Sequence, residues 1–378
     1  MKRRSIAARP DWEATVASQG LTYHHVAGRP YWNETAFYEF TAREVDNLEQ
    51  ATNELHEMCL AAVQHVIDED LFARMRISDL AATLVRKTWD AEPPAIYGRF
   101  DLAYDGTQIK LLEYNADTPT ALVEAAVIQW YWMKDNFPHG DQFNSIHDKL
   151  IAKWKELLQY CGSPLFFAGV DDAVHEDLMT LSYLADTAQQ AGHTVTLLNM
   201  GEIGYDHDSY RFVSPSREPI KSVFKLYPWE WMLAEEFGQY LNQTSVATDW
   251  IEPPWKMVLS NKGILPVLWE MYPNHQYLLP AYFEDEQPNT LVEYCRKPIF
   301  GREGKNVSLH RRSGELSNEG EYGQEGYIRQ AIAPIPEFEG KFPVLGSWVI
   351  DGESAGVGIR ESETPISDNF SRFVPHMF

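Results

Sequence analysis

Residues 97–115 alternate in polarity on either side of an Asp-Gly pair, and this alternation predicts a β-hairpin. Even-numbered positions are apolar, and odd-numbered positions are polar. The even set contains Phe100, Leu102, Leu112 and Tyr114, and the odd set contains Arg99, Asp101, Glu113 and Asn115. Because successive side chains of a strand point to opposite faces, we expect one apolar face. The other face carries a cation, two carboxylates and a carboxamide.

The turn decides whether these four polar groups meet. A two-residue loop would pair Tyr104 with Thr107, and the polar groups of the two strands would then face apart. A three-residue loop, residues 104–106 with glycine in the left-handed position of a G1 bulge, would pair Ala103 with Thr107. All four polar groups would then share one face. Because the other register would bury charge, we predict the three-residue loop, with both carboxylates on the same face.

The polar face suggests a site for a hard cation. Asp101, Glu113 and Asn115 offer oxygen ligands, which Mg²⁺ prefers, commonly together with substrate phosphates. Two other interpretations fit the same residues. One is a surface salt-bridge network joining Arg99, Asp101, Lys110 and Glu113, and the other is a carboxylate pair for glycoside hydrolysis. The arginine and asparagine on this face favour a nucleotide–metal site.

Composition restricts the classes of partner. The chain has 378 residues, which predicts two or three subdomains, and its net charge of −23 argues against a nucleic-acid partner. Its three cysteines, Cys59, Cys161 and Cys295, indicate neither a disulfide framework nor a thiolate zinc site. The first ten residues lack the apolar run of a signal peptide, and no window approaches the roughly 18 apolar residues of a membrane span. We therefore expect a cytoplasmic protein without membrane contact.

Hydrophobic spacing predicts helices before the hairpin and an open α/β layer after it. A capping-box pattern from Thr41 to Glu44 begins a helix expected to reach about residue 67. Further helices are expected at residues 77–90 and 120–136. Residues 165–170, 177–190 and 193–198 have the pattern of a strand, a helix and a strand, which is a Rossmann-like β-α-β unit. It lacks the GxGxxG of dinucleotide-binding proteins.

The rest of the chain alternates shorter elements. Strands are expected at residues 223–227, 257–260 and 290–294, and a hairpin around Asp351-Gly352. We divide the chain into a mainly helical region (1–95), the polar hairpin with its helices (96–162), the β-α-β layer (163–215) and a final region (216–378). The tryptophans, including Trp229, Trp231 and Trp255, are expected in the core.

A basic, glycine-containing loop is the second chemical signal. Lys297 ends a strand pattern, and residues 301–305 add two glycines and two further cations. Backbone N–H groups of such a loop can bind an anion, although a plain surface hairpin has the same composition. Lys262, at the end of another predicted strand, is a weaker signal. The chain has no Walker motif and no zinc-binding spacing among its histidines, the pair His24-His25 included.

Four segments together resemble one known family. They are Arg99-Phe-Asp101, Glu113-Tyr-Asn-Ala-Asp117, Lys297-Pro-Ile-Phe-Gly-Arg-Glu-Gly304 and the tail from Leu345-Gly-Ser-Trp through Gly358-Ile-Arg360 to Ser371-Arg-Phe-Val-Pro375. In this order, they resemble the glutathionylspermidine synthetase family of ATP-grasp ligases, in its synthetase-only, acid–amine-ligase-like branch. The resemblance implies a mixed α+β and α/β chain with an ATP-grasp fold, a preATP-grasp layer at 163–215 and a glycine-loop lid within 216–378.

The resemblance also implies roles for individual residues. Asp101, Glu113 and Asn115 fall on Mg²⁺ ligands, and Arg302 and Arg360 match arginines that face the reacting carboxylate and its phosphate. ATP binding falls on Arg99, Lys262, Lys297, Glu303, Gly304, Gln330 and Ala333. Thr118 and Thr120 stand where the family tends to have serines near the peptide substrate, and Glu176 and Asp177 fall near its polyamine-binding carboxylates. The start of a helix favours such acids as well, through its dipole.

The reaction so implied joins a carboxylate to an amine. ATP phosphorylates the carboxylate, an amine displaces phosphate, and an amide, ADP and phosphate result. Glutathione and spermidine are the first expectation for acid and amine. A different peptide or amino acid and a different amine form a second interpretation, because Lys225-Leu-Tyr-Pro-Trp-Glu-Trp231 departs from the family's Lys-Thr-Trp-x-Trp-Glu-Thr. The third is a nucleotide-binding module without turnover.

Overall fold

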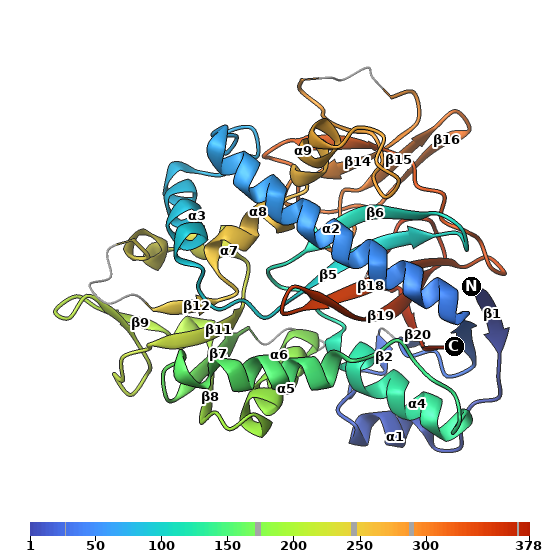
Figure 1. The fold of residues 1–378 in the computed structure, drawn as a ribbon, viewed down its shortest axis with the longest axis horizontal. Helices are drawn as coiled ribbons and strands as arrows, with labels where there is room; N and C mark the ends of the chain where they lie inside the picture. The colour runs from blue at the N-terminus through green and yellow to red at the C-terminus, as the bar shows by residue number, and fades with distance from the viewer. Residues whose placement is uncertain (27, 171–174, 243–247, 287–290, 369) are drawn as a thin grey trace.

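The computed structural model describes residues 1–26, 28–170, 175–242, 248–286, 291–368 and 370–378, and every statement below concerns those residues. Two five-stranded sheets and one four-stranded sheet form its centre. Figure 1 shows one five-stranded sheet in the middle of the molecule, the four-stranded layer at the lower left and the other five-stranded sheet at the upper right. The fold is therefore mixed α/β with several sheets.

The central sheet carries the predicted hairpin. Its strand order is β20-β19-β18-β5-β6, and all its neighbours are antiparallel. Its strands are β5 (Tyr97–Tyr104), β6 (Ile109–Asn115), β18 (Phe342–Ile350), β19 (Glu353–Ser362) and β20 (Arg372–Val374). The predicted hairpin around Asp351-Gly352 is confirmed as β18–β19. It lies directly beside β5, so both hairpins belong to one sheet.

Helix α2 (Ala42–Asp68) crosses one face of the central sheet (Figure 1). Its predicted capping box is confirmed: Thr41 accepts from the backbone N–H of Glu44, and the Glu44 carboxylate accepts from the backbone N–H of Thr41. One stripe of the helix, including Leu48, Leu55 and Val63, is fully buried. This stripe packs the N-terminal region onto the sheet, because burial of an amphipathic face stabilises a helix more than its intrinsic propensity does.

The turn between β5 and β6 differs from the predicted one. Tyr104 pairs with Ile109, so the loop is residues 105–108 rather than 104–106, and Ala103 pairs with Lys110 instead of Thr107. The carboxylate of Asp105 accepts the backbone N–H groups of Thr107 and Gln108 at 2.8 and 2.7 Å. This local bonding closes a longer loop, which the residue spacing did not reveal.

With this four-residue loop, regular pairing would put the polar residues of β5 opposite apolar residues of β6. A β-bulge at Leu112 prevents this. Leu102 pairs with Leu111, whereas Asp101 pairs with Glu113 and Arg99 with Asn115. The four polar groups therefore share one face, as predicted, but a bulge and not the turn brings them together. The bulge also exchanges the faces on which two leucines lie. Leu111 is in the core, whereas Leu112, predicted on the apolar face, lines a cavity beside Glu113.

The second sheet is parallel throughout and confirms the predicted β-α-β unit. Its order is β12-β11-β7-β8. The strands are β7 (Leu165–Gly169), β8 (Val195–Asn199), β11 (Ser222–Leu226) and β12 (Asp249–Ile251). Helix α6 (Glu176–Gln190) connects β7 to β8, and α5 (Ile146–Glu156) packs against α6. A short hairpin, β9 (Gly204–Asp206) with β10 (Arg211–Val213), follows β8.

The third sheet is antiparallel and carries the basic loop. Its order is β13-β17-β14-β15-β16. The strands are β13 (Ala281–Phe283), β14 (Tyr294–Pro298), β15 (Ser308–Arg311), β16 (Gly314–Ser317) and β17 (Tyr327–Ala331). Helix α9 (Ile264–Met271) packs against β13, and α8 (Met257–Ser260) packs against β6 of the central sheet. Two further helices, α3 (Asp79–Ala91) and α7 (Trp229–Ala234), lie on the other side of the molecule (Figure 1).

Three predicted elements need correction. Residues 257–260 form helix α8 and not a strand, since a short apolar run that is buried on all sides shows no period. Of the strand predicted at 290–294, Thr290 lies outside the described residues, and β14 begins only at Tyr294. The helix predicted at 120–136 is divided into a π-helical turn, Glu124–Ile128, and α4 (Gln129–Asn136).

The two ends of the chain lie side by side (Figure 1). They share a small sheet in the order β1-β4-β21, formed by β1 (Lys2–Ser5), β4 (Ala36–Glu39) and β21 (His376–Met377). Between β1 and β4 lie α1 (Trp12–Ser18) and the two-stranded pair β2 (His25–Val26) and β3 (Arg29–Pro30). Within the described part of the chain, helices capable of crossing a membrane are absent.

Candidate active site

A polar cavity of about 330 Å³ lies where the three sheets meet, and the polar face of β5–β6 forms part of its wall. Asp101 stands at its centre between two arginines. Arg99 Nε lies 2.8 Å from its Oδ1, and Arg360, from β19, pairs with its Oδ2. The Arg99 and Asp101 side chains are only 7 and 6% exposed, and Lys110 donates instead to the backbone carbonyl of Gln276. These contacts exclude the alternative of a surface salt-bridge network.

Glu113 faces Asp101 across the hairpin and is held by lysines. Lys262 Nζ lies 2.9 Å from Glu113 Oε2 and also donates to the carbonyl of Gly301 at 2.6 Å. Burial alone would raise the pKa of Glu113, but the charges of Lys262 and Lys297 outweigh it and lower the pKa to about 2. The Glu113 carboxylate is therefore ionised across the whole physiological pH range.

The bulge at Leu112 is where the third sheet attaches to the hairpin. Lys297 Nζ donates to the carbonyl of Leu112 and to Gln330 Oε1, both at 2.7 Å, and Gln330 Nε2 donates to the carbonyl of Leu111 at 3.0 Å. Burial lowers the pKa of Lys297. The irregular backbone of the bulge thus supplies acceptors that a regular strand would use within its own sheet.

A narrower, mostly apolar slot of about 110 Å³ opens beside this junction. Its lining includes Lys297, Gln330 and Ala333 with neighbouring aliphatic side chains. Gly304 borders both the slot and the polar cavity. A small, mostly apolar cavity with a few polar groups suits an apolar ring with polar edges.

The basic loop, residues 299–307, closes over the junction of the two cavities. Glu303 and Gly304 have left-handed backbone conformations, with φ of 56° and 66°. A Cβ atom on Gly304 would lie 2.0 Å from the carbonyl oxygen of Ser367, so only glycine fits there. Arg302 donates to Thr118 Oγ1 at 2.8 Å and to Glu230 Oε1 at 2.6 Å. The loop is therefore fastened to the exit of the hairpin.

The other predicted substrate residues line the far side of the polar cavity. The carbonyl of Thr120 accepts from Arg99 at 2.7 Å, and Asn115 Oδ1 accepts from the backbone N–H of Thr118 at 3.1 Å. Glu176 and Asp177 face the cavity from the start of α6. Burial, followed by the charge of Glu124, raises the pKa of Glu176 to about 7.

Several residues in or beside the cavity escaped the sequence reasoning. Glu124, beside the cavity, is fully buried and accepts hydrogen bonds from Tyr23 and from the cavity-lining Tyr31, at 2.5 and 2.7 Å. Trp231, expected in the core, is 41% exposed and lines the cavity with Glu230, whereas Trp229 and Trp255 are buried as expected. For Glu124, the sequence offered one signal: its carboxylate lies in a run of small apolar residues. An unpaired charge is rarely buried without a purpose.

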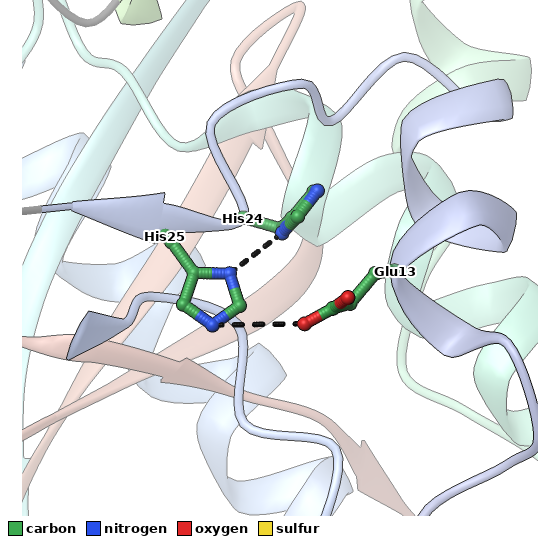
Figure 2. A group of neighbouring side chains, drawn as sticks. All are labelled: Glu13, His24 and His25. Carbon is green, nitrogen blue, oxygen red and sulfur yellow. Dashed lines mark hydrogen bonds and ion pairs between the residues drawn. The ribbon is translucent and has the colours of Figure 1, made fainter. Parts of the chain in front are cut away.

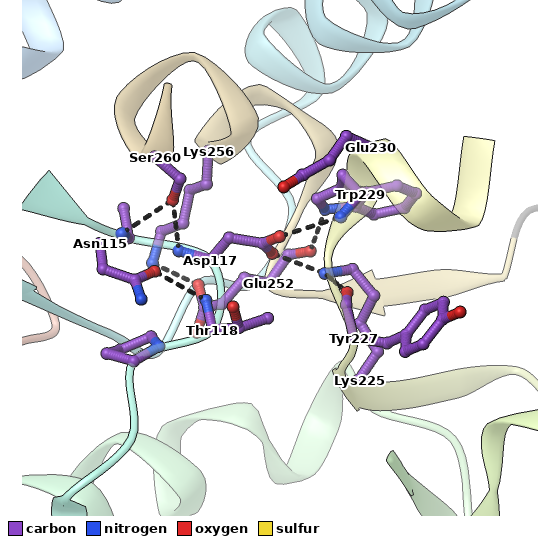
Figure 3. Close-up of polar contacts among 12 residues, drawn as sticks. Asn115, Asp117, Thr118, Lys225, Tyr227, Trp229, Glu230, Glu252, Lys256 and Ser260 are labelled. Carbon is purple, nitrogen blue, oxygen red and sulfur yellow. Dashed lines mark hydrogen bonds and ion pairs between the residues drawn. The ribbon is translucent and has the colours of Figure 1, made fainter. Parts of the chain in front are cut away.

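A buried ion pair fastens the hairpin to the parallel layer (Figure 3). Lys225, at the end of β11, lies 2.5 Å from Asp117 Oδ1, and the backbone N–H of Trp229 donates to Asp117 Oδ2 at 3.1 Å. Ser260 Oγ accepts the backbone N–H of Asp117 at 3.0 Å. Burial raises the pKa of Asp117 and lowers that of Lys225, while each charge favours the other. Neither residue was assigned a role from the sequence.

Comparison with known proteins fits this geometry. Residues 3–378 match the family model described as glutathionylspermidine synthase preATP-grasp. The chain belongs to this family. The resemblance seen in the sequence is thereby confirmed, and the family is one of ligases.

Individual relatives span different lengths. A Haemophilus influenzae protein named "Putative acid--amine ligase" is 40% identical over 393 residues, covering all of both chains. The trypanothione synthetase of Crithidia fasciculata is 28% identical, over 85% of this chain and 53% of its own. The bifunctional glutathionylspermidine synthetase/amidase of Escherichia coli is 26% identical, over 90% of this chain and 58% of its own. The chain thus spans little more than half of the last two.

A solved structure supports the fold. A glutathione synthetase-like effector of Globodera pallida superposes with a TM-score of 0.56 at 10% identity, covering 98% of this chain and 99% of that one. The overall arrangement of sheets and helices is therefore that of a glutathione synthetase-like protein.

Proposed function

We propose that this protein is an ATP- and Mg²⁺-dependent ligase that joins a carboxylate to an amine through an acyl phosphate. One observation carries the proposal: oxygen ligands and cations converge where the apolar slot opens into the polar cavity. The cations are Arg99, Lys262, Lys297, Arg302 and Arg360, and the oxygen ligands are Asp101, Glu113 and Asn115. Such a junction can hold the base of a nucleotide on one side and its phosphates on the other.

The residues present fit Mg²⁺. Asp101 and Glu113 are directly paired across the hairpin, and Asn115 follows on the same face, so the three residues offer the oxygen donors that a hard cation prefers. They would hold the ion. When bound, Mg²⁺ supplies positive charge beside the transferring phosphoryl group. The ion pairs that Asp101 makes with arginine, and Glu113 with lysine, would be loosened on binding.

ATP would lie across the junction in an ATP-grasp fold. Gln330 and Ala333 would contact the base in the slot, and Lys297 and Lys262 the phosphates. The Glu303-Gly304 turn would cover the phosphates as a lid and exclude water, which would otherwise hydrolyse the intermediate. In this assignment, residues 163–215 are the preATP-grasp layer, 216–378 provide most of the nucleotide site, 96–162 the metal hairpin and 1–95 a helical cover.

The polar cavity would hold the acid. Its carboxylate oxygen attacks the γ-phosphorus, the bond from that phosphorus to the β,γ-bridging oxygen breaks, and ADP leaves. Arg302 and Arg360 face this position and neutralise charge on the carboxylate and the transferred phosphoryl group. The amine nitrogen then attacks the acyl carbon, phosphate leaves, and the nitrogen loses a proton to give the amide. Thr118 and Thr120 would orient the acid.

The acidic side of the cavity fits a cationic amine. Glu176 and Asp177 face the cavity, and Glu124 lies just behind them. The names of the relatives point to glutathione and spermidine, which we take as the first candidates for acid and amine. Trp231 favours a second candidate, a different peptide or amino acid, because a half-exposed indole occupies the cavity wall next to Arg302.

ADP release with paired acids and amines tests the proposal. We expect ADP only when ATP, Mg²⁺, an acid and an amine are all present, with the amide detected by mass spectrometry. Glu113→Gln should lower the rate about 100- to 1,000-fold, as removal of an electrostatic contact to the reacting groups does. Glu57→Gln, an exposed carboxylate on α2, is the matched control and should have no effect. Tight ATP binding without ADP release under any pair would indicate a nucleotide-binding module and overturn the proposal.

A further inference from the structure

We propose that Glu13, His24 and His25 form a second metal site, for a divalent transition ion of the Zn²⁺ class. The proposed site does not depend on the ligase reaction, and its imidazole ligands differ from the oxygen ligands of the proposed Mg²⁺ site. Two imidazoles and one carboxylate suit zinc, copper or nickel, whereas magnesium prefers oxygen alone.

The three side chains converge from two elements (Figure 2). One potential ligand atom of each lies within 4.8 Å of the others. His24 Nδ1 is 2.8 Å from His25 Nδ1, and His25 Nε2 is 3.8 Å from Glu13 Oε1. With bonds of about 2.0–2.2 Å to zinc, ligand atoms on one tetrahedral ion lie roughly 3–4 Å apart. These two contacts use different nitrogens of His25, and only one of them can bind a given ion. Side-chain rotation would therefore have to bring one atom of each residue, now within 4.8 Å of the others, into that range.

The scaffold around the three side chains restricts their movement. The Trp12 ring packs edge-to-face on His24 at 5.7 Å and stacks on His25 at 5.8 Å between centroids. The carbonyl of His24 accepts the backbone N–H groups of Tyr31 and Trp32, at 2.8 and 3.3 Å. A site held in this way needs little reorganisation to bind. The Glu13 and His25 side chains are 57 and 33% exposed, so an ion has access.

The two imidazole rings already face each other, because their Nδ1 atoms lie within hydrogen-bonding distance. With three protein ligands, the fourth position of a tetrahedral ion is left for water.

An ion here would act on the wall of the polar cavity. It would join α1, through Glu13, to the β2–β3 pair, which is flanked by Tyr23 and Tyr31. Both tyrosines hydrogen-bond to buried Glu124, and Tyr31 itself lines the cavity. The proposed metal site therefore lies on the outer side of the cavity wall, and the acidic groups lie on the inner side of the same wall.

The test is zinc titration of metal-free protein prepared without a histidine tag, in competition with a chromogenic chelator and in the absence of ATP. We expect one equivalent of Zn²⁺ to bind, saturating Mg²⁺ to leave this binding unchanged, and Co²⁺ to give a ligand-field absorption spectrum. His24→Ala and His25→Ala should each weaken binding at least about 100-fold, beyond the usual effect of losing an outer-shell contact. Glu13→Gln, at an exposed position, tests the site where a histidine variant fails to fold.

The control is His139→Ala, an exposed histidine outside the cluster, which should bind zinc as the parent does. Equal zinc affinity in the parent and in the Glu13→Gln and His24→Ala variants overturns the proposal. So does equal weakening by His139→Ala, or the absence of binding at 1 mM Zn²⁺. Because no step uses ATP, acid or amine, these outcomes are independent of the proposed ligase activity.

Discussion

The carboxylates at the two ends of the polar cavity have opposite electrostatic environments. At the nucleotide end, Asp101 lies between two arginines and Glu113 against a lysine, and the pKa of Glu113 falls to about 2. At the far end, buried Glu124 accepts hydrogen bonds from Tyr23 and Tyr31, and burial followed by the charge of Glu124 raises the pKa of Glu176 to about 7. Carboxylates paired with arginine or lysine can exchange those cations for a metal ion and phosphates. A carboxylate whose pKa is raised by burial and by a neighbouring acid is stabilised in its ionised form by a positively charged substrate.

Breaking the ion pair that joins the hairpin to the parallel layer should have the largest effect, which is on the free energy of unfolding. Lys225→Met leaves Asp117 buried without its counter-ion, and such a loss costs about 3–5 kcal/mol of unfolding free energy. Adding Asp117→Asn should restore much of it, because the uncompensated charge is gone. Denaturant unfolding measures both variants. The control is Glu353→Gln, whose partly exposed pair with Lys149 is worth at most about 1 kcal/mol. Equal losses in Lys225→Met and the control would show that the buried pair does not hold the two layers together.

Gly304→Ala should disturb the nucleotide end alone. Its Cβ would meet the Ser367 carbonyl, and a left-handed residue other than glycine costs about 1–2 kcal/mol in addition. We expect a higher KM for ATP with little change in the KM for the amine. Gly340→Ala shares the positive φ, at 75°, but has open space around it. This control separates the cost of the left-handed backbone from the cost of the steric clash. An unchanged KM for ATP in Gly304→Ala would show that the loop is not part of the nucleotide site.

Glu176→Gln should disturb the far end alone, and by the smallest amount. The pKa of about 7 means that Glu176 becomes ionised as the pH rises through neutrality, so the KM for a cationic amine should fall over that interval. The variant should lose this pH dependence and raise the KM about 10-fold at pH 8, equivalent to about 1.4 kcal/mol for a charged hydrogen bond.

Unfolding gives a second measure of the same carboxyl group. Because its folded pKa of about 7 exceeds the ordinary 4.5, the folded state binds more protons, and stability falls as pH rises between these values. Glu176→Gln should abolish that part of the decline. A KM profile in Glu176→Gln identical to the parent's would contradict the contrast drawn between the two ends. Thr22→Ser, at an exposed position near this wall, is a conservative control.

Alternation within each strand predicted that four polar groups of the hairpin share one face, and the structure agrees because a bulge at Leu112 resets the pairing. It could not find the bulge at Leu112, because the extra residue is defined by pairing with another strand. For the same reason Leu112 was assigned to the wrong face. Residues 257–260 were mistaken for a strand because buried helices and buried strands are both uniformly apolar.

Without the family resemblance, the residues themselves indicated the candidate site only where they are close in sequence. Glu13 and the histidine pair lie in different elements, so no spacing motif joins them. Trp231 and Glu230 lie within a segment whose departure from the family pattern was noticed, yet nothing in that segment showed that the indole faces a cavity. Lys225 and Asp117, more than a hundred positions apart, meet only through the packing of two sheets.

The bulge has a consequence for how this hairpin can change in evolution. Since parity is reset at Leu112, the pairs nearest the catalytic face are independent of the number of residues in the distal turn. Insertions or deletions at residues 105–108 would leave Asp101 opposite Glu113. Deletion of Leu112 would also leave Asp101 opposite Glu113, but it would remove the bulge and with it the carbonyl to which Lys297 donates. The tip can thus vary in length, whereas Leu112, a hydrophobic residue, contributes to this junction through its backbone carbonyl.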